Sequence, residues 1–414
     1  MTTATGPRAT PQVSGLLDAR AATYREHIER LGPLPRLRTE QLLGEVADAG
    51  LTGRGGAHFP TARKLAAVAG TRHALVVGNA AEGEPASCKD RVLLGSAPHL
   101  VLDGLALARD VVGTRRTALA GPPDVLDGPL ARALAERRER VRLVGIPEGF
   151  VTGQETSVVS AALGRPAKPA TLTGPLVAGG LGGQPALVLN VETLAHLALI
   201  VRYGPNWWRC RGVPQDPGTR LVSLSGSVRW PGVFEFGGGS TLGDLIATAG
   251  GTTEAVQALL VGGYHGGWVP WTSETADCPF TTQGLQSHGA APGAGVVIAL
   301  PAAHCGLEAA AGVVAYLAGE SAGQCGPCRN GLPALADHLE ALAYGHSTPQ
   351  TVRELYRLSN LVEGRGACRH PDGTARFLRS TLRTFADEVQ HHLAGHCSAR
   401  AEAPTTRRTP WLLN

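Results

Sequence analysis

Residues 53–91 restrict the fold of this chain more than any other stretch. They open with GRGGAHFPTARK, a glycine-rich turn that ends at Lys64, and continue into a strand-like run at residues 74–77. Glycines let a backbone turn tightly and approach a ligand closely, and the pair Pro60-Thr61 is typical of the first turn of a helix. Backbone N–H groups at such a turn, with Arg54 and Lys64 beside them, suit a phosphate.

A second polar segment follows the strand-like run directly. Its sequence is GNAAEGEP from residue 78, and Lys89-Asp90-Arg91 come shortly after. Ligands of open α/β sheets bind at the carboxyl ends of the strands, where both segments should lie. The alternative is a glycine turn beside a solvated charged loop, but two adjacent clusters favour a binding pocket.

The first half of the chain alternates between helix-like and strand-like segments. We expect helices at 37–49, 99–112, 128–138 and 194–201, and strands at 74–77, 116–120 and 141–146. Strands that alternate with helices predict a parallel, doubly wound sheet and an α/β domain. The preceding residues 1–36 form an N-terminal extension with one helix near 16–31.

The second half of the chain is expected to contain a strand-rich segment and then a helical segment. Residues 205–218 are expected to be a linker, and strands follow near 219–229, 232–236 and 257–262, with a helix at 241–249 that Gly250 ends. Further helices are expected at 307–317, 332–342, 348–361 and 377–393, which predicts a four-helix bundle over 305–395. The tail, 396–414, is expected to be disordered.

Composition excludes several classes of protein. The 414 residues are 43% hydrophobic and carry a formal charge of +4, which fits a globular chain of two to three domains. The charge is too small and too scattered to favour a nucleic-acid partner. No apolar run is long enough to span a membrane, and the N-terminus lacks the apolar core of a signal peptide. We therefore expect a cytoplasmic protein without direct membrane insertion.

The cysteines indicate metal chemistry in a reducing compartment rather than a disulfide scaffold. Cys325 and Cys328 are separated by two residues between the first two helices of the bundle, and Cys368 lies between the last two. Such a pair can point both sulfurs at one metal, and a distant third cysteine can close the site.

The two polar segments resemble the flavin-binding segments of the NADH-binding F subunit, roughly 51 kDa, of respiratory complex I. The same module occurs in the flavoprotein subunits of NAD-linked hydrogenases and formate dehydrogenases. Three further segments resemble that family: FVTGQET from residue 150, RPAKP from residue 165 and LNVET from residue 189. The resemblance covers roughly residues 37–395.

The resemblance implies a domain order. Residues 37–205 would be a Rossmann-like domain that binds FMN and NAD(H), and residues 219–300 a small β-grasp domain of the SLBB (soluble-ligand-binding) kind. Residues 305–395 would be the bundle that binds an iron–sulfur cluster. It also implies the residues that contact FMN and NAD(H): Gly53, Arg54, Gly55, Gly56, Phe59, Lys64, Asn79, Glu82, Glu84, Gly153, Glu155, Asn190 and Thr193.

By this resemblance, Lys64 and Arg54 neutralise the FMN phosphate, and Glu84 and Glu155 position the nicotinamide nucleotide. The flavin carries the chemistry, so no side chain is needed as a catalytic nucleophile or general base.

The family's cluster segment reads Glu-Ser-Cys-Gly-x-Cys-x-Pro-Cys-Arg-x-Gly, with a fourth cysteine downstream. Cys325, Cys328 and Cys368 match three ligands of its [4Fe–4S] cluster, but Ala322 stands at the fourth position. Cys305 should lie about 20 Å away along a helix, and Cys397 is in the tail.

Three interpretations of this site remain open. A cluster forms with water, Ser321 or another group on the fourth iron. Alternatively, zinc binds Cys325, Cys328, Cys368 and His370. In the third interpretation, the cysteines are remnants in a bundle that folds without metal.

Several positions of the flavin and nucleotide pocket depart from the family pattern. They are His58, Ala67, Ala81, Gln154 and Leu189. The leading prediction is an NADH dehydrogenase (quinone)-type subunit, in which FMN takes a hydride from NADH and passes single electrons to the cluster. From there they would reach a partner subunit or a quinone-reducing complex.

Two rivals remain open, and the departures favour the first of them. One is a diverged homologue that binds a metal or flavin as an assembly protein without oxidising NADH, and the other is a flavin electron carrier fed by ferredoxin. The expected partners are other electron-transfer subunits, ferredoxin-like or thioredoxin-like iron–sulfur proteins, so the chain would be free or peripheral to a membrane complex.

Overall fold

A four-stranded parallel sheet organises the first half of the chain. In this computed structural model, which describes residues 13–171, 174–345 and 347–399, the strand order is β3 (Arg142–Gly145), β2 (Thr117–Gly121), β1 (Leu75–Asn79) and β4 (Ala186–Asn190). All three strand pairs are parallel, and Asn79 pairs with Asn190 at the ends of β1 and β4. The two asparagines therefore lie side by side at the carboxyl edge of the sheet.

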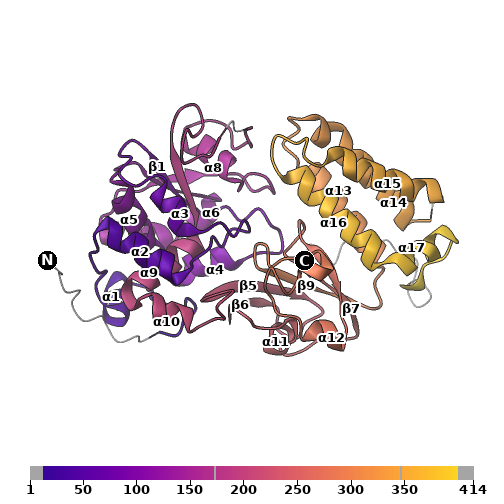
Figure 1. Ribbon diagram of the computed structural model, residues 1–414, viewed down its shortest axis with the longest axis horizontal. Coiled ribbons are helices and arrows are strands. Elements are labelled where there is room, and N and C mark those ends of the chain that lie inside the picture. Colours follow the sequence, from indigo (N-terminus) through magenta and orange to yellow (C-terminus); the bar gives the residue numbers. More distant parts are fainter. Residues whose placement is uncertain (1–12, 172–173, 346, 400–414) are drawn as a thin grey trace.

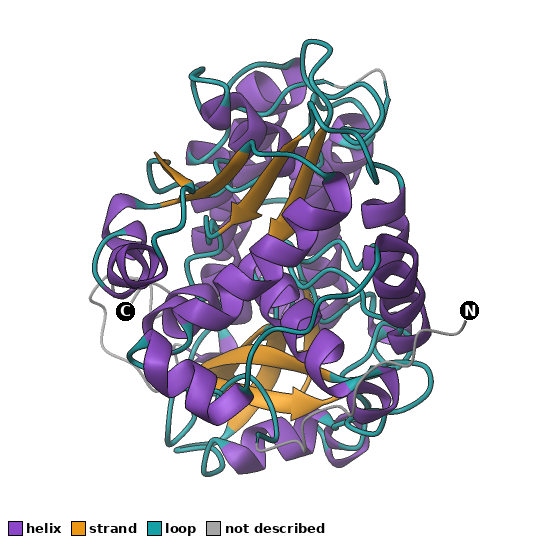
Figure 2. Cartoon of the chain, turned by 90° about the vertical axis from the view of Figure 1, so that its left-hand side faces the viewer, coloured by secondary structure: helices purple, strands orange, loops and turns teal. Residues whose placement is uncertain are grey.

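Helices cover both faces of this sheet (Figures 1 and 2). Val76 faces the larger core, which contains the apolar residues of α5 (Pro98–Val112) and α9 (Val191–Tyr203). Its neighbours Leu75 and Val77 face a second core with α8 (Glu155–Ala162). Successive side chains of a strand point to opposite faces, so the continuous apolar run of β1 fills both cores.

The remaining helices of this domain surround the sheet and the loops at its carboxyl edge. They are α1 (Tyr24–Leu31), α2 (Thr39–Ala49), α3 (Thr61–Ala66), α4 (Lys89–Ser96), α6 (Pro123–Leu126), α7 (Pro129–Arg137) and α10 (Pro205–Arg209).

Residues 205–218, expected to be a linker, were assigned wrongly in their first part. Helix α10 packs into the main core through Trp207 and Trp208, and Trp208 is fully buried. The abundance of Pro and Gly suggested a linker, but burial of large aromatic surface holds this segment against the domain.

The middle of the chain forms a five-stranded mixed sheet in the order β6-β5-β9-β7-β8. The expected strands are β5 (Thr219–Gly226), β6 (Gly232–Gly237) and β7 (Val256–Val261), with α11 (Leu242–Thr248) between them. Two strands were not expected, β8 (Gly267–Pro270) and β9 (Val296–Pro301), together with α12 (Ser273–Ala276) and the 3₁₀ turn η1 (Gln286–His288). Strand β9 runs parallel to β5 and antiparallel to β7, so it holds the centre of the sheet.

The last part of the chain is helical. Helices α13 (Gly306–Gly319), α14 (Leu332–Ala343) and α15 (Pro349–Val362) match the prediction, and the π-turn η2 (Pro327–Gly331) leads into α14. The expected helix at 377–393 is instead two helices, α16 (His370–Thr384) and α17 (Ala386–Leu393), because Phe385 leaves the helical conformation at φ −106°, ψ 36°.

Helix α16 begins at His370, two residues after Cys368. Residues 396–399 of the expected tail are described and lie against the bundle through Cys397 and Ala399, whereas 400–414 and 1–12 lie outside the described residues.

The predicted fold class is confirmed: a parallel-sheet α/β domain, a small β domain and a helical C-terminal domain follow one another. Over the described residues, no single helix is long and apolar enough to cross a membrane; α4 and α5 pass the length and composition test only as a pair, and they are bent by 98° relative to each other.

Helices α5 and α9 approach each other at Gly104. A Cβ atom there would lie 1.9 Å from the Leu194 carbonyl oxygen, so Gly104→Ala must push α9 away from the sheet. We expect a loss of about 1–3 kcal/mol in the free energy of unfolding, measured by urea denaturation.

Gly95→Ala is the matched control, because a Cβ atom at that helical glycine meets nothing within 4 Å. Helix propensity should make this variant neutral or slightly more stable. Equal stability of the two variants would contradict the close approach at Gly104.

Candidate functional site

A cavity of about 1150 Å³ opens at the carboxyl edge of the parallel sheet, with walls from all three domains. It brings together twelve of the thirteen predicted cofactor-binding residues. These are Gly53, Gly55, Gly56, Phe59, Lys64, Asn79, Glu82, Glu84, Gly153, Glu155, Asn190 and Thr193. The β domain adds Gly262, His265 and Gly293, and the helical domain adds Cys368, Arg369 and His370.

The glycine-rich loop is closed by its own backbone. The N–H of Gly53 donates to the Phe59 carbonyl at 2.9 Å, and the Thr61 N–H donates to the Leu51 carbonyl at 2.9 Å. His58, where the family has a glycine, adopts φ 50°, which is a left-handed conformation that glycine tolerates best. Burial lowers the pKa of His58 to about 4, so the imidazole is neutral against the β domain.

Arg54 is the predicted site residue that does not line the cavity. Its backbone N–H donates to Thr193 Oγ1 at 2.9 Å, and its guanidinium turns behind the loop to the Thr219 carbonyl at 2.9 Å. The guanidinium carbon also lies 5.8 Å from the centroid of the Trp208 ring. Arg54 therefore holds the loop against β5 rather than presenting its charge to a ligand.

The floor of the cavity is formed by Asn79 and Asn190. Asn79 donates from Nδ2 to the Gly153 carbonyl at 2.9 Å, and its Oδ1 accepts the Ala81 N–H at 3.0 Å. Asn190 caps α9 by accepting the Glu192 N–H at 3.0 Å and donates to Asp90 Oδ2 at 2.5 Å. Both asparagine side chains hydrogen-bond to nearby backbone groups. The pairing of β1 with β4 fixes their positions side by side.

Beside these asparagines lies a buried ion-pair network that the sequence did not predict. Lys89 Nζ lies 2.6 Å from Asp90 Oδ1 and 2.9 Å from Glu192 Oε2, and all three side chains are at most 3% exposed. Burial opposes the charge on Lys89, but the two carboxylates outweigh it and raise the lysine pKa. Burial raises the pKa of Asp90 to about 7, although Lys89 acts against this shift. The adjacent, oppositely charged residues Lys89 and Asp90 were the feature of the sequence that could have indicated this network.

Glu84 is a buried carboxyl group at the cavity wall. Its Oε2 accepts the Tyr264 N–H at 2.8 Å, whereas its Oε1 has no hydrogen-bond partner among the described residues. Burial raises the pKa of Glu84 to about 8, so the group is protonated at neutral pH. A neutral Glu84 carboxyl group does not repel an anionic ligand in the cavity as a carboxylate would.

The mouth of the cavity carries a second charged pair and an aromatic face. Lys64 is ion-paired with Glu155, and both side chains line the cavity. The Phe59 ring is 46% exposed and lies 5.5 Å from the Arg63 guanidinium carbon. Ala67 also lines the cavity, so the second aromatic face of the family pattern is absent at that position.

The three predicted metal-binding cysteines meet at one end of the helical domain. Cys325 and Cys328 are hydrogen-bonded to each other, and the charge of Cys325 also acts on Cys368. Burial raises the pKa of Cys328 to about 12 and also raises that of Cys368. Burial opposes ionisation of Cys325, but N–H groups of Ala367 and Cys328 outweigh it and lower its pKa.

These three cysteines are not arranged for a single zinc ion. Among the described residues, the donor atoms of Cys325, Cys328, Cys368 and His370 do not all come within 4.8 Å of one another; that spacing occurs instead at Cys305, Glu388, His392 and Cys397. His370 Nε2 lies 2.8 Å from the Leu317 carbonyl, and its buried Nδ1 has no hydrogen-bond partner among the described residues. The described residues therefore show no ready four-ligand zinc group at this end of the helical domain.

The cavity and the cysteine site adjoin each other. Phe150 lines the cavity, and its N–H donates to Glu320 Oε2 at 2.9 Å, next to Ser321 and Ala322. Its ring is 4.5 Å from the His265 ring and 5.5 Å from the His370 ring, measured between centroids. Gln324 Nε2 donates to the Pro169 carbonyl at 2.8 Å, which docks the cysteine loop on the α/β domain.

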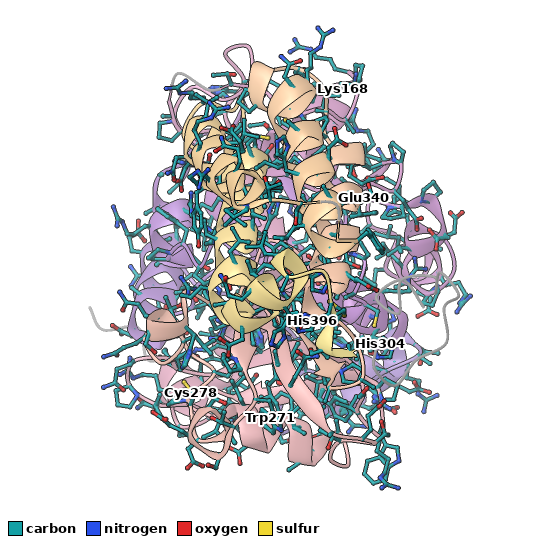
Figure 3. The ribbon with its side chains drawn as sticks, turned by 90° about the vertical axis from the view of Figure 1, so that its right-hand side faces the viewer. Lys168, Trp271, Cys278, His304, Glu340 and His396 are labelled. Carbon is teal, nitrogen blue, oxygen red and sulfur yellow. The ribbon has the colours of Figure 1, made fainter. Side chains whose placement is uncertain are left out.

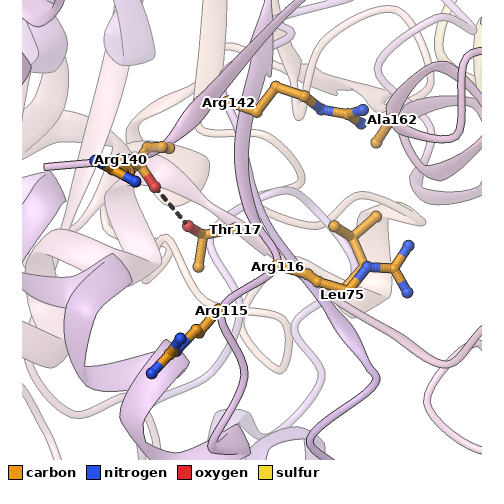
Figure 4. A pocket seen from close by; sticks show the side chains of 8 residues that line it. Leu75, Arg115, Arg116, Thr117, Arg140, Arg142 and Ala162 are labelled. Atoms are coloured by element: carbon orange, nitrogen blue, oxygen red, sulfur yellow. Dashed lines mark hydrogen bonds between the residues drawn. The ribbon is translucent and has the colours of Figure 1, made fainter.

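A smaller cavity of about 420 Å³ lies at the opposite edge of the sheet (Figure 4). Leu75, Thr117 and Arg142, at the amino ends of β1, β2 and β3, line it with Arg115, Arg116 and Arg140. The ligand position of an open α/β sheet is the carboxyl edge, so the larger cavity is the candidate site.

Three family models match this chain in the order that the domains follow. The Nuo51 FMN-binding domain matches residues 46–199, the SLBB domain matches 221–263, and the NADH-ubiquinone oxidoreductase-F iron–sulfur binding region matches 308–392. The fold and the two adjoining sites thus define a protein with an FMN-binding domain and an iron–sulfur binding region.

Known proteins resemble the chain over most of its length. The F subunit of NADH-quinone oxidoreductase in Streptomyces coelicolor is 29% identical over 404 residues, which cover 90% of this chain and 88% of that protein. The F 2 subunit of the enzyme in Rhizobium meliloti is 30% identical over 377 residues, which cover 86% of this chain and 89% of that protein. The chain belongs to the family of NADH-quinone oxidoreductase F subunits.

The fold also matches a solved structure. A chain of an NAD⁺-reducing [NiFe]-hydrogenase in the H₂-reduced state aligns with a TM-score of 0.79 and 30% identity over 87% of this chain. This chain spans 64% of that hydrogenase chain.

FMN fits the residues of the larger cavity. A Cβ atom at Gly83 would lie 2.5 Å from the Phe150 carbonyl oxygen, so the loops that form the cavity approach more closely than a side chain allows. The ammonium of Lys64 lines the cavity and offers a donor to an anionic ligand, and the Oε1 of Glu84 is a buried polar atom without a partner among the described residues. The cluster site fits in part, since three thiols are present and Ala322 offers no ligand atom.

Glu84 makes stability depend on pH. Its ordinary pKa is 4.5 and its folded value about 8, so between these values the native carboxyl keeps a proton that the unfolded chain has lost. The free energy of unfolding should therefore fall by roughly 1.4 kcal/mol per pH unit in this window from this group and level off above it. Glu84→Gln, which cannot ionise, should flatten this slope in urea denaturation of the ligand-free protein.

Glu340→Gln is the control, because Glu340 is exposed on α14 and does not line the cavity. It should reproduce the pH dependence of the unaltered protein. A Glu84→Gln variant with that same dependence would show that Glu84 is ionised in the native state.

Proposed function

We propose that this chain is a flavin- and iron–sulfur-dependent oxidoreductase subunit that passes electrons from NADH to a partner. One observation carries the proposal: the cavity that the FMN-binding domain forms is also lined by Cys368 and His370 of the cysteine site. FMN, when bound, accepts two electrons as a hydride and releases them singly to an iron–sulfur cluster. Electron transfer from the flavin to the cluster is favoured when the cavity and the cysteine site adjoin each other, because the path between them is then short.

The residues of the cavity have separate tasks. Lys64 supplies the positive charge toward the FMN phosphate, in place of the Arg54 guanidinium, which is turned away. The glycine-rich loop supplies backbone N–H groups, and the neutral Glu84 carboxyl adds no negative charge beside the ligand. Phe59 offers an exposed ring at the mouth on which the nucleotide can stack.

Cys325, Cys328 and Cys368 would hold the cluster. Ser321 is the nearest candidate for the corner that lacks a cysteine, because its hydroxyl is hydrogen-bonded to Cys328. A cluster with one non-cysteine corner differs in reduction potential from one with four thiolates, since ligand identity and net charge set that potential.

The electron acceptor is proposed to be another electron-transfer subunit with an iron–sulfur cluster. The relatives are named as subunits of NADH-quinone oxidoreductases, and a subunit implies further subunits to which electrons can pass. The chain would then act on the cytoplasmic side, peripheral to a membrane complex.

A flavin carrier that does not use NADH is the second candidate. Ala67 and Gln154 favour it, because both line the cavity where the family pattern has an aromatic and an acidic residue. Loss of a stacking face costs roughly 1–3 kcal/mol for a nucleic-acid base, and a similar loss here would weaken NADH binding.

The spectrum of the protein purified without air tests the function. We expect flavin bands and about four iron atoms per chain, with bleaching of the flavin on addition of NADH. Flavin and iron without bleaching by NADH, but with bleaching by reduced ferredoxin, would establish the second candidate instead. A colourless protein would overturn both.

Lys64→Gln tests the assignment of the phosphate charge. Loss of a charged hydrogen bond of about 1.5–3 kcal/mol should weaken FMN binding by roughly 10- to 100-fold, measured by flavin fluorescence during titration of the flavin-free protein. Lys168→Gln removes an exposed lysine that does not line the cavity and should leave the affinity unchanged. An unchanged affinity in Lys64→Gln would place the phosphate elsewhere.

A further inference from the structure

Four potential metal ligands meet at the other end of the helical domain, apart from the cysteines already described. They are Cys305, Glu388, His392 and Cys397, and their sulfur, nitrogen and oxygen ligand atoms all lie within 4.8 Å of one another. Cys305 precedes α13, Glu388 and His392 are one turn apart on α17, and Cys397 follows that helix. Figure 3 labels His304 and His396, sequence neighbours of the two cysteines, close together on this side of the molecule.

The four ligands are mostly withdrawn from solvent. Cys305 is 7% exposed, and the side chains of His392 and Glu388 are 2% and 11% exposed. Cys305 Sγ lies 3.4 Å from His392 Nε2 and 3.9 Å from Glu388 Oε1. These separations suit one small ion, because zinc binds sulfur at about 2.3 Å and nitrogen or oxygen at about 2.0–2.2 Å.

The hydrogen bonds around His392 bring two acceptor atoms together at the centre of the four ligands. Its Nδ1 lies 3.0 Å from the Leu342 carbonyl, which can only accept, so Nδ1 carries the proton of the neutral ring. Its Nε2 is then an acceptor, yet it faces Glu388 Oε1, another acceptor, at 3.0 Å. Two acceptors at this distance require a proton or a metal ion between them.

The surroundings of the other ligands are those of a prepared metal site. The Cys305 sulfur accepts the Glu308 N–H in the first turn of α13, and the Cys397 sulfur accepts the Ala399 N–H. Glu388 also accepts the Ser398 N–H at 3.0 Å and the Ser398 hydroxyl. Outer hydrogen bonds of this kind orient ligands and hold a histidine in the tautomer that binds metal.

We propose that Cys305, Glu388, His392 and Cys397 bind one Zn²⁺ ion as a structural site. Two thiolates, an imidazole and a carboxylate form a ligand set that zinc accepts in tetrahedral geometry, and four protein ligands leave no open position for substrate. Binding releases the two thiol protons to solvent and involves no electron transfer. The ion ties α17 and the segment after it to the start of α13, which closes the bundle.

Metal analysis of the full-length protein, purified without air and passed over a desalting column, tests this site. We expect about one zinc per chain in addition to iron. Cys397→Ser and His392→Asn should lose the zinc and keep iron and flavin, whereas Cys325→Ser should lose iron and keep zinc. His396→Asn, an exposed neighbour, and Cys278→Ser, in the β domain, should keep both metals.

A second measurement does not depend on whether these variants fold. A zinc chelator added to the unaltered protein should lower Tm, and added Zn²⁺ should restore it. Three results would overturn the proposal: protein that contains no zinc and takes up none, zinc that is lost with Cys325 rather than Cys397, or a Cys305–Cys397 disulfide in the air-free protein. The first of these would leave a protonated His392 paired with Glu388.

None of these outcomes depends on NADH oxidation, so the zinc site and the proposed function can fail separately.

Discussion

The buried ammonium of Lys89 joins the elements that form the cavity. It pairs with Asp90 of its own helix and with Glu192 at the start of α9, and Glu192 in turn accepts the Leu221 N–H of β5 at 2.8 Å. A single charge thereby holds α4, α9 and the β domain at the carboxyl edge of the sheet. Removal of one partner of a buried pair leaves an uncompensated charge, which typically costs about 3–5 kcal/mol, or roughly a fifth or more of the stability of an ordinary domain.

The same constraint explains why charged groups of the cavity behave so differently. Asp90 and Glu192 share one lysine, and burial raises the pKa of Asp90 while the lysine keeps Glu192 ionised. Glu84 has no such partner and remains protonated at neutral pH. The cavity therefore holds less negative charge than its carboxyl groups suggest, which suits an anionic ligand.

Sequence motifs located the cavity, because its glycine loop and the polar ends of β1 and β4 are local features with strong residue preferences. They could not show that the Arg54 guanidinium turns behind the loop, since that depends on Trp208 and Thr219, far along the chain. Arg54 was expected at the FMN phosphate, and its side chain supports the loop instead. The Cys397 segment was missed for a related reason: short, polar and near the end of the chain, it looked disordered, and only the fold brings it to Cys305.

The cavity has a thermodynamic role beyond chemistry, because its wall is shared among three domains. A ligand that contacts all three binds only when they are docked, so its binding free energy adds to the cohesion between them. Loss of flavin would then loosen the interfaces first and the individual cores later. A chain without the cofactor would then present a less well-ordered surface to its partners than a chain with the cofactor bound, so cofactor binding would favour assembly with those partners.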